Sequence, residues 1–359
     1  MKIFFDARYI RTDFHDGISR FSTELGTALS DITTVTFLIY DKDQIKFLPK
    51  NAKYITIHNP TSALEPLTAL ILNKYHPDVV FSPMQTIGAF GRKFKLILTL
   101  HDMIYYHHRT PPVQFNPIIR FGWWLFHATY IPQRLLLNSA DIVATVSDTS
   151  RQEFLSHKIT KRPIVVIYNA PQQLRKLLKK AIDIKKAPKN LVYMGSFMPY
   201  KNVETLIRGM DFLPNHTLHL LSRIKPSRQS ELKDLISKNA NVVFHNGVSD
   251  KEYAEVLSDK ALLVTASLDE GYGLPIAEAQ ALGVPAVIND MPIFHEVAGD
   301  GALYFDGTDP KDFAEKVKEA SVQSNYIELS KKATEQSKKF SWDKSASTLL
   351  NIINGLVSK

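Results

Sequence analysis

Two glutamates bracket a glycine-containing turn in the stretch SLDEGYGLPIAEAQ. Glu270 and Glu278 are separated by seven residues, among them Gly271 and Gly273. Glycine permits positive φ and lets the backbone approach a ligand closely, whereas carboxylates accept hydrogen bonds from hydroxyl groups. Because two carboxylates would repel phosphate, we expect sugar and ribose hydroxyls as their partners. The alternative for Glu278 is a favourable interaction with a helix dipole, since we expect it in or near the first turn of the following helix.

A lysine follows a glycine-ended strand in the stretch YMGSFMPYKNVETLIRGM, residues 193–210. Gly195 ends the expected strand, and Asn202 is a suitable N-cap for the helix that follows. Lys201 then lies beside a helix N-terminus, where a cation adds to the positive end of the dipole. This placement is unfavourable unless an anion shares the site, so the sequence favours a phosphate-binding lysine.

Two loops in the first half of the chain carry further candidates. In DGISRF, residues 16–21, the helical spacing of apolar residues predicts a helix that starts just after Gly17, whose backbone could approach an anion. The alternative is a simple loop glycine. His101 and Asp102 follow the expected strand 96–100, and His101 could hydrogen-bond a sugar hydroxyl or a leaving oxygen. The alternatives are a structural histidine and an aspartate that ties down its own loop.

Short apolar runs alternate with helical patterns along almost the whole chain. The runs with strand character are KIFF (2–5), VTFLIY (35–40), DVVFS (78–82), LILTL (96–100), DIVATV (141–146), IVVI (164–167), LVYM (191–194), TLHLL (217–221), VVFH (242–245), ALLVTA (261–266), PAVI (285–288) and ALYF (302–305). Near-continuous apolar strands that are each followed by a helix are typical of parallel sheets buried on both faces. Two such series predict two doubly wound α/β domains, joined by a basic, proline-flanked linker at 169–190.

Length and composition limit the class of protein. A chain of 359 residues exceeds what one hydrophobic core usually supports, which agrees with two domains. We expect a cytoplasmic protein, because no apolar run reaches the roughly 18 residues of a membrane span and Asp6 and Arg8 interrupt the position of a secretory leader. The absence of cysteine excludes disulfides, thiolate metal sites and cysteine nucleophiles. The net charge of +8 is compatible with an anionic partner or simply with a basic, soluble surface.

The glutamate pair inside EGYGLPIAEAQALGVP resembles the signature of the family-four retaining glycosyltransferases of GT-B fold. Other stretches resemble motifs of this family in the correct order: DGISRF, HD (101–102), VSDTSR (146–151), MGSFMPYKN, HNGVSDKEYAEVL, FHEVAGDGALYFD and FSWDKSA (340–346). The resemblance implies two Rossmann-like domains that face a central cleft. Their expected bounds are 1–168 for the acceptor-side domain and 191–340 for the nucleotide-sugar domain, with a C-terminal helix at 341–359 that crosses back to the first domain.

The resemblance also implies roles for single residues in transfer of a sugar from a nucleotide diphosphate. His101 and Glu270 would act on the donor sugar near the reacting centre, and Glu278 would bind the ribose. Lys201 and the backbone of Gly17 would hold the diphosphate. The further donor-binding positions are backbone near Val248 for the base, with Ser196, Arg223, Gly271, Tyr272, Gly273 and Leu274.

Two positions depart from the family pattern. Many relatives have an arginine in the glycine–lysine loop, whereas this chain has Ser196 and Tyr200 there, so the diphosphate charge would rest more on Lys201, with Arg223 as a second candidate. The residue before Glu270 is Asp269, which places another carboxylate near the sugar.

We expect no cofactor and no metal, because helix dipoles and Lys201 can carry the charge of the leaving group. Asp41 and Asp43 form an Asp-x-Asp pair, but they follow VTFLIY in a polar loop and are expected at the surface. The nucleotide sugar is a co-substrate.

The motifs are most similar to those of bacterial mannosyl- and rhamnosyltransferases of surface polysaccharide and lipopolysaccharide assembly. We therefore expect GDP-mannose as donor and a glycan or lipid-linked acceptor, with a UDP-hexose as the alternative donor. A non-catalytic docking subunit of the same fold is a further alternative. A nucleic-acid partner is disfavoured, because the lysines are scattered and no aromatic-basic module is present.

The stretch 105–137 interleaves arginines with aromatic residues. Arg109, Arg120 and Arg134 alternate with Phe115, Phe121, Trp123, Trp124, Phe126 and Tyr130. Helices of this composition often rest at a membrane interface, so we expect peripheral contact with the inner face of the plasma membrane. The alternative is that the tryptophan pair packs inside the first domain.

Overall fold

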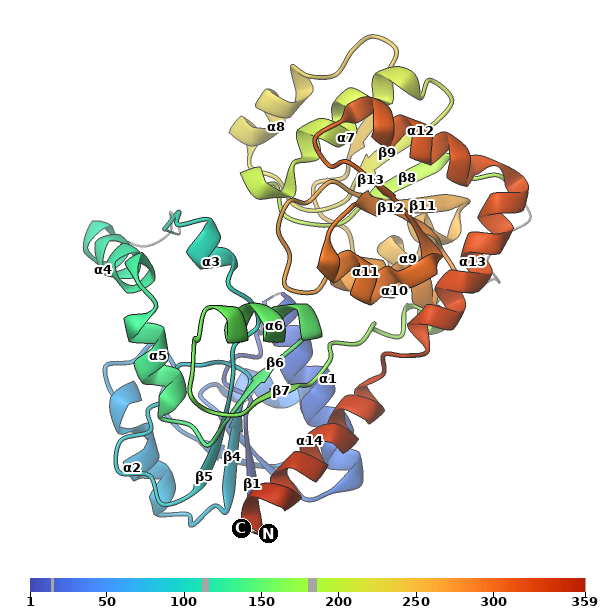
Figure 1. Ribbon diagram of the computed structural model, residues 1–359. Helices are drawn as coiled ribbons and strands as arrows, with labels where there is room; N and C mark the ends of the chain where they lie inside the picture. Colours follow the sequence, from blue (N-terminus) through green and yellow to red (C-terminus); the bar gives the residue numbers. More distant parts are fainter. Residues whose placement is uncertain (14–15, 112–115, 180–185, 359) are drawn as a thin grey trace. The chain divides into compact units, whose positions relative to one another are not determined.

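The computed structural model describes residues 1–13, 16–111, 116–179 and 186–358 (Figure 1). The chain divides into two compact units, which we call the N-terminal unit, Met1–Asn169 with Ser341–Lys359, and the C-terminal unit, Ala170–Phe340. Each unit is built around one parallel β-sheet. The expected class, two doubly wound α/β sheets, is confirmed.

The sheet of the N-terminal unit has seven strands in the order β3-β2-β1-β4-β5-β6-β7, and every neighbouring pair is parallel. The strands are β1 Ile3–Asp6, β2 Val35–Ile39, β3 Lys53–Thr56, β4 Val79–Ser82, β5 Lys95–Thr99, β6 Ile142–Thr145 and β7 Ile164–Val166. The six strands expected in this half are present. The edge strand β3 was not expected, because most of its residues are exposed and it has no continuous apolar run.

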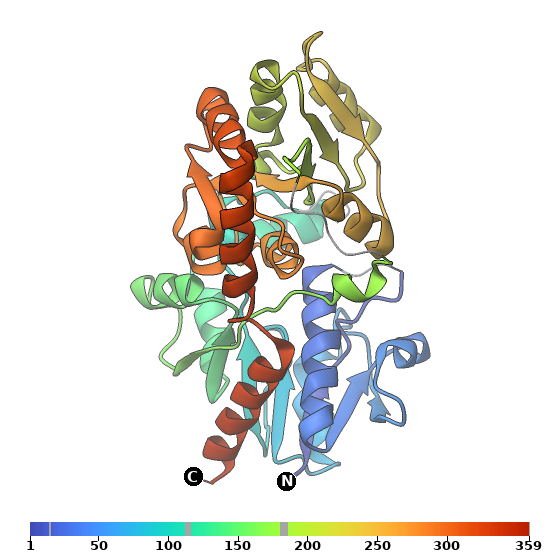
Figure 2. The ribbon, with the colours of Figure 1, turned by 90° about the vertical axis from the view of Figure 1, so that its right-hand side faces the viewer.

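The helices of this unit follow from capping and from apolar spacing. They are α1 Gly17–Ile32, η1 Lys42–Phe47, η2 Glu65–Leu67, α2 Thr68–Asn73, α3 Ile104–His107, α4 Pro117–Ala128, α5 Ile131–Asn138, α6 Asp148–Ser156 and α14 Trp342–Val357. In α1, Asp16 caps the N-terminus, and Phe21, Leu25 and Leu29 are buried. Helix α14 lies beside α1, as Figure 2 shows, with the Trp342 ring edge-on to Phe21 at 5.9 Å between centroids.

The sheet of the C-terminal unit has six parallel strands in the order β10-β9-β8-β11-β12-β13. They are β8 Asn190–Tyr193, β9 Thr217–Leu220, β10 Asn241–Phe244, β11 Ala261–Thr265, β12 Ala286–Asn289 and β13 Ala302–Phe305. All six coincide with expected runs. The helices are η3 Leu174–Leu177, η4 Pro199–Lys201, α7 Val203–Gly209, η5 Met210–Phe212, α8 Pro226–Lys233, α9 Asp250–Ser258, α10 Leu274–Ala281, α11 Pro292–Ala298, η6 Gly299–Gly301, α12 Pro310–Ser321 and α13 Gln323–Ser337.

The stretch 169–190, expected as a linker, is only partly described, because residues 180–185 lie outside the described part of the chain. Within it, η3 packs against α9 of the C-terminal unit. Asn190, expected as the last linker residue, is instead the first residue of β8, where it pairs with Thr217 and Ala261.

In each sheet the strand order reverses at one place. The reversal lies between β1 and β4 in the N-terminal unit and between β8 and β11 in the C-terminal unit. In open parallel sheets, ligands bind beside the carboxyl ends of the strands at such a switch point. The loops after these four strands are therefore the places where functional side chains are expected.

Candidate active site

The loop after β8 requires a glycine. The Tyr193 hydroxyl donates to the carbonyl oxygen of Ser196 at 2.6 Å and so folds the loop back over Gly195. A Cβ at Gly195 would lie 2.8 Å from that hydroxyl, which is too close. Burial, with the nearby Glu270 carboxylate, raises the pKa of Tyr193 well above its ordinary value, so the phenol stays protonated. Gly195 and Ser196, two of the expected donor-binding positions, thus form one compact turn.

Lys201 and Glu270 form an ion pair across the switch point. Lys201 Nζ lies 2.5 Å from Glu270 Oε1, and only 13% and 18% of the two side chains are exposed. Their loops are joined by the backbone, since the Leu268 N–H donates to the Tyr200 carbonyl at 2.8 Å. Lys201 Nζ also lies 5.0 Å from the centroid of the Tyr200 ring. The anion that the placement of Lys201 requires is therefore supplied by Glu270.

Asn202 precedes α7 but does not cap it as expected. It adopts a left-handed backbone conformation, with φ 49° and ψ 43°, and its side chain makes no capping hydrogen bond to the helix backbone. Instead Nδ2 donates to the Gly307 carbonyl at 2.6 Å, and Oδ1 accepts from the Thr205 hydroxyl at 3.1 Å. Asparagine suits the left-handed region better than most residues do. Asn202 therefore fixes the turn that carries Lys201 and not the helix end.

The turn between the two glutamates has the expected backbone. Gly273 has φ 94° and precedes α10, so a glycine is needed there. Pro275 lies in the first turn of α10, as expected. Tyr272 is buried, with its ring edge-on to Phe340 at 5.9 Å, whereas Leu274 is half-buried.

Glu278 lies just past the first turn of α10, near the position expected. It is the fifth residue of the helix, and its first turn contains no acidic residue. Only 5% of its surface is exposed. The interaction of a carboxylate with the helix dipole falls off beyond the first turn. The dipole alternative for Glu278 is therefore weakened, and a buried carboxylate that accepts hydrogen bonds is favoured.

Arg223 and Val248 lie in the loops after β9 and β10. Gly247 has φ 105°, and a Cβ there would lie 2.8 Å from Cγ of Arg223, so the exposed arginine crosses the backbone next to Val248. The Ile224 N–H donates to Asn246 Oδ1 at 3.1 Å and joins the two loops. The structure thus places Arg223 beside the loop assigned to the base.

Gly17 and His101 belong to the N-terminal unit. Gly17 is the first residue of α1, and Asp16 occupies the helix end: Oδ1 accepts from the Ser19 N–H at 2.9 Å, and Oδ2 pairs with Arg11 Nε at 2.9 Å. An anion at Gly17 would therefore meet an acidic neighbour, which the sequence reasoning did not include.

His101 is a half-buried imidazole at the end of β5. Its Nε2 lies 2.8 Å from the Pro83 carbonyl, to which it must donate, and this leaves Nδ1 as the acceptor nitrogen in the neutral ring. Burial lowers the pKa of His101 below its ordinary value, so the ring is neutral at pH 7. Phe21 packs edge-on at 5.1 Å between centroids. Asp102 Oδ1 accepts from the Ile104 N–H at 3.1 Å, which confirms that it ties down its own loop.

The Asp-x-Asp pair has a local role. Asp41 caps η1 by accepting from the Asp43 N–H, and the exposed Asp43 pairs with Lys46 at 2.7 Å. The surface expectation is confirmed for Asp43. Among the described residues, no group of three or more His, Cys, Asp or Glu side chains is placed to hold a metal ion.

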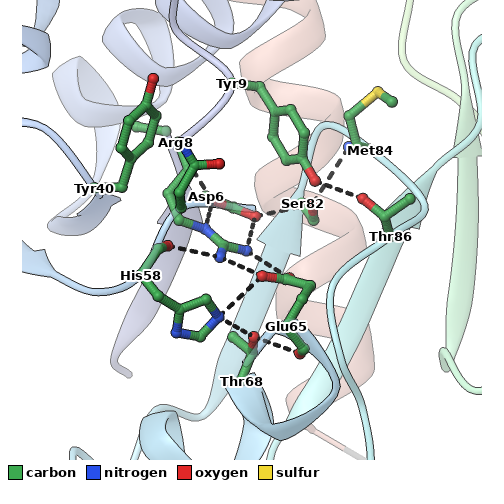
Figure 3. Close-up of polar contacts among 12 residues, drawn as sticks. Asp6, Arg8, Tyr9, Tyr40, His58, Glu65, Thr68, Ser82, Met84 and Thr86 are labelled. Atoms are coloured by element: carbon green, nitrogen blue, oxygen red, sulfur yellow. Dashed lines mark hydrogen bonds and ion pairs between the residues drawn. The ribbon is translucent and has the colours of Figure 1, made fainter. Parts of the chain in front are cut away.

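Sequence reasoning missed a buried ionic cluster at the switch point of the N-terminal unit (Figure 3). Arg8, almost fully buried, pairs with Asp6 at 2.8 Å and with Glu65 at 2.7 Å. The signal was an Asp-x-Arg sequence directly after an apolar strand, where buried charge needs a partner.

The stretch 105–137 exposes many of its apolar side chains. No residue of α4 is buried, and Trp124 is 46% exposed, so the tryptophan pair does not pack inside the unit. Trp123 is half-buried, and its ring packs against that of His127 in a tilted arrangement, with 4.0 Å between centroids. Phe115 lies outside the described residues. In the described part of the chain, no helix has the length and apolar character that crossing a membrane requires.

Two family models match the chain. The model described as glycosyl transferases group 1 matches residues 175–340, and the model described as glycosyltransferase family 4 matches residues 45–170. An O-antigen chain mannosyltransferase of Salmonella typhimurium is 27% identical over 320 residues, which cover 84% of this chain and 86% of that protein.

Solved structures share the fold. Sucrose-phosphate synthase from Thermosynechococcus elongatus superimposes with a TM-score of 0.76 at 17% identity, covering 99% of both chains. HepE of Anabaena in complex with UDP gives a TM-score of 0.73 at 18% identity, covering 99% of this chain and 100% of that one.

Proposed function

Because the chain belongs to the family-four glycosyltransferases of GT-B fold, and is therefore a glycosyltransferase, we propose that it transfers mannose from GDP-mannose with retention of configuration. The acceptor is a glycan or a lipid-linked glycan of a cell-surface polysaccharide. The similarity to an O-antigen chain mannosyltransferase, which extends over 84% of the chain, supports the choice of sugar and pathway.

The ion pair between Lys201 and Glu270 carries the proposal. It lies at the switch point of the C-terminal unit, where a ligand is expected, and it combines a cation for phosphate with a carboxylate for sugar hydroxyls. On donor binding, Lys201 exchanges Glu270 for the diphosphate, and Glu270 turns to the hydroxyls of the mannose. Glu278 accepts hydrogen bonds from the ribose, and the loop at Val248 receives the base.

The chemical step needs no nucleophile from the protein. The acceptor hydroxyl attacks C1 of the sugar from the face that the diphosphate leaves, so the C1–O bond to phosphate breaks while the bond to the acceptor oxygen forms. The departing diphosphate takes the acceptor proton. Lys201 stabilises the charge that develops on the leaving group, and neutral His101 hydrogen-bonds the donor sugar.

A panel of nucleotide sugars, with mass detection of free nucleotide, tests the function. We expect release of GDP from GDP-mannose, unaffected by EDTA because Lys201 replaces a metal. Release of UDP from a UDP-hexose alone would establish the alternative donor. Loss of activity with EDTA would refute the metal-free assignment, and release from no donor would indicate a non-catalytic subunit.

The proposal extends to peripheral contact with anionic lipid at the inner face of the plasma membrane. Five exposed apolar residues of α4 support it: Ile118, Ile119, Phe121, Trp124 and Leu125. Two of the arginines are engaged within the unit, since Arg109 donates to the Tyr106 carbonyl and Arg134 to those of His157 and Lys158. Apolar insertion therefore contributes more to this contact than the basic residues do.

Co-sedimentation with phosphatidylglycerol vesicles tests the contact. Ile118→Ser/Phe121→Ser should release the protein, whereas salt should weaken binding only partly. The matched control is Leu64→Ser, an exposed apolar residue outside the helix. If the unaltered protein stays in the supernatant at low salt, the membrane assignment is wrong.

A further inference from the structure

Asp6, Arg8 and Glu65 form a buried network that fixes the chain after β1. Arg8 donates to both oxygens of Asp6, at 2.8 and 3.0 Å, and to both oxygens of Glu65, at 2.7 and 2.9 Å. His58 Nε2 lies 3.0 Å from Glu65 Oε2 and from the Thr68 hydroxyl oxygen, and it donates its one proton between them, because the hydroxyl donates its own proton to the Glu65 carbonyl. Planar, bidentate pairs of this kind fix orientation as well as charge.

A second set of hydrogen bonds, made by Gln44, holds the same segment after β1. Gln44, fully buried in η1, donates from Nε2 to the carbonyl oxygens of Ala7, Arg8 and Ile10, the shortest contact being 2.7 Å. Its Oε1 accepts from the Tyr40 N–H at 3.0 Å. Buried polar groups that are hydrogen-bonded on several sides fix the conformation of the loop after β1 before a ligand binds.

Tyr9 lies in this loop, and its side chain is partly exposed. Its hydroxyl lies 2.5 Å from the Thr86 hydroxyl, which comes from the loop after β4 (Figure 3). Two hydroxyls that share one hydrogen bond use one of their two O–H donors and retain one donor together with several lone pairs. Burial, with the Asp6 carboxylate, raises the pKa of Tyr9 above its ordinary value, so the phenol keeps its proton.

The loop after β4 also reaches His101. The Pro83 carbonyl, three residues before Thr86, accepts from His101 Nε2 at 2.8 Å. The Ser82 hydroxyl donates to Asp6 Oδ2 at 3.2 Å and connects the base of this loop to the buried network. The carboxyl ends of β1, β4 and β5 in the N-terminal sheet thus carry the buried network, the Tyr9–Thr86 pair and His101.

We propose that the Tyr9 and Thr86 hydroxyls bind adjacent hydroxyl groups of the acceptor sugar at the switch point between β1 and β4, where the buried network and Gln44 hold the segment that carries Tyr9. A pair of neighbouring hydroxyls, one able to donate and both able to accept, matches a vicinal diol. The proposal rests on the proposed function, because it assumes a carbohydrate acceptor.

The test compares Tyr9→Phe and Thr86→Val with the unaltered full-length protein. In transfer assays we expect KM for the acceptor to rise about five- to tenfold in each variant, with KM for the donor and Tm unchanged. The two effects should be less than additive, because both variants break the same pair. Thr86→Ser, which keeps the hydroxyl, should restore KM for the acceptor. Tyr54→Phe, on the exposed edge strand β3, is the matched control.

Saturation-transfer NMR with methyl mannoside gives a readout that is independent of turnover. The unaltered protein should transfer saturation to the sugar, and Tyr9→Phe should lose this signal. The proposal is overturned if the unaltered protein gives no signal, or if Tyr9→Phe keeps both the signal and the KM for the acceptor. The proposed function fails separately, when no nucleotide sugar is hydrolysed or consumed by the unaltered protein.

Discussion

Lys201 and Glu270, 69 residues apart in the chain, form a short ion pair between the loops after β8 and β11. Each residue was expected to meet a different part of the donor, yet in this structure each meets the other. Because both side chains are largely buried, neither charge is well hydrated without a partner. Under the proposed function, donor binding therefore exchanges one partner of Lys201 for another.

Replacing Lys201 should weaken binding of the diphosphate and not of the nucleoside. We expect Lys201→Ala to lose about 1.5–3 kcal/mol of affinity for GDP, the energy of a charge-assisted hydrogen bond, and Lys201→Arg to lose less. Guanosine should bind all three proteins equally in calorimetry. Lys251→Ala, a surface lysine of α9, is the control. If guanosine and GDP lose affinity to the same extent, Lys201 is not the phosphate ligand.

Replacing Glu270 should have the opposite effect on nucleotide binding. In Glu270→Gln, Lys201 no longer has to leave a carboxylate, so GDP should bind about fivefold more tightly, on the scale of the coupling within one ion pair. Turnover should fall, because the carboxylate that accepts from the sugar hydroxyls is lost. Calorimetry and initial rates measure the two effects. Weaker GDP binding in this variant would contradict the exchange of partners.

Glu278 should act through the ribose. We expect Glu278→Gln to weaken GDP by about 1.5–3 kcal/mol, but to have little effect on 2′,3′-dideoxy-GDP, which lacks the hydroxyl groups. Glu315→Gln, an exposed glutamate of α12, is the control. Equal losses for both nucleotides would mean that Glu278 acts on the structure of the turn and not on the ribose.

The fold was largely predictable because most of its strand residues are buried. Twelve of the thirteen strands in the described part of the chain coincide with predicted, mostly apolar runs, and the exception, β3, is an edge strand whose side chains are mostly exposed. β3 is held by one neighbour, β2, through the backbone, which leaves little trace in its side chains. The pattern of apolar residues therefore indicates which segments are buried, but not which strands are neighbours in the sheet.

The loops of the candidate site were also predictable, because glycines mark them, but the contacts within them were not. Gly273 has the positive φ that its place in the turn indicated. The pairing of Lys201 with Glu270 depends on which strands are neighbours at the switch point, and Asn202 turns its amide to Gly307, in a loop 105 residues away. Such long-range partners outweigh local preferences for capping.

His101 should make stability depend on pH. Burial lowers its pKa in the folded protein below the ordinary 6.5, so the unfolded chain binds the extra proton first. Its contribution to stability is complete above the pKa of the unfolded state and is lost as pH falls below about 6.5. His127, His216 and His219 shift in the same direction, so the test is a difference between two proteins. Thermal unfolding of His101→Gln should lose less stability between pH 7.5 and pH 5.5 than the unaltered protein, and an identical loss would refute the assignment.

Removing one charge from the network around Arg8 should destabilise the fold more than removing all of its charges together. Burial alone would lower the pKa of Arg8, but the Asp6 and Glu65 carboxylates raise it above its ordinary value, so it stays charged. Arg8→Met leaves two buried carboxylates without their cation, and we expect a loss of about 3–5 kcal/mol in the free energy of unfolding. Adding Asp6→Asn and Glu65→Gln to the same variant should recover part of this loss, because no buried charge is then left unpaired. Urea unfolding of the full-length chain measures both. A single variant that costs less than about 1 kcal/mol, or a triple variant less stable than the single one, would show that the charges do not act as a set.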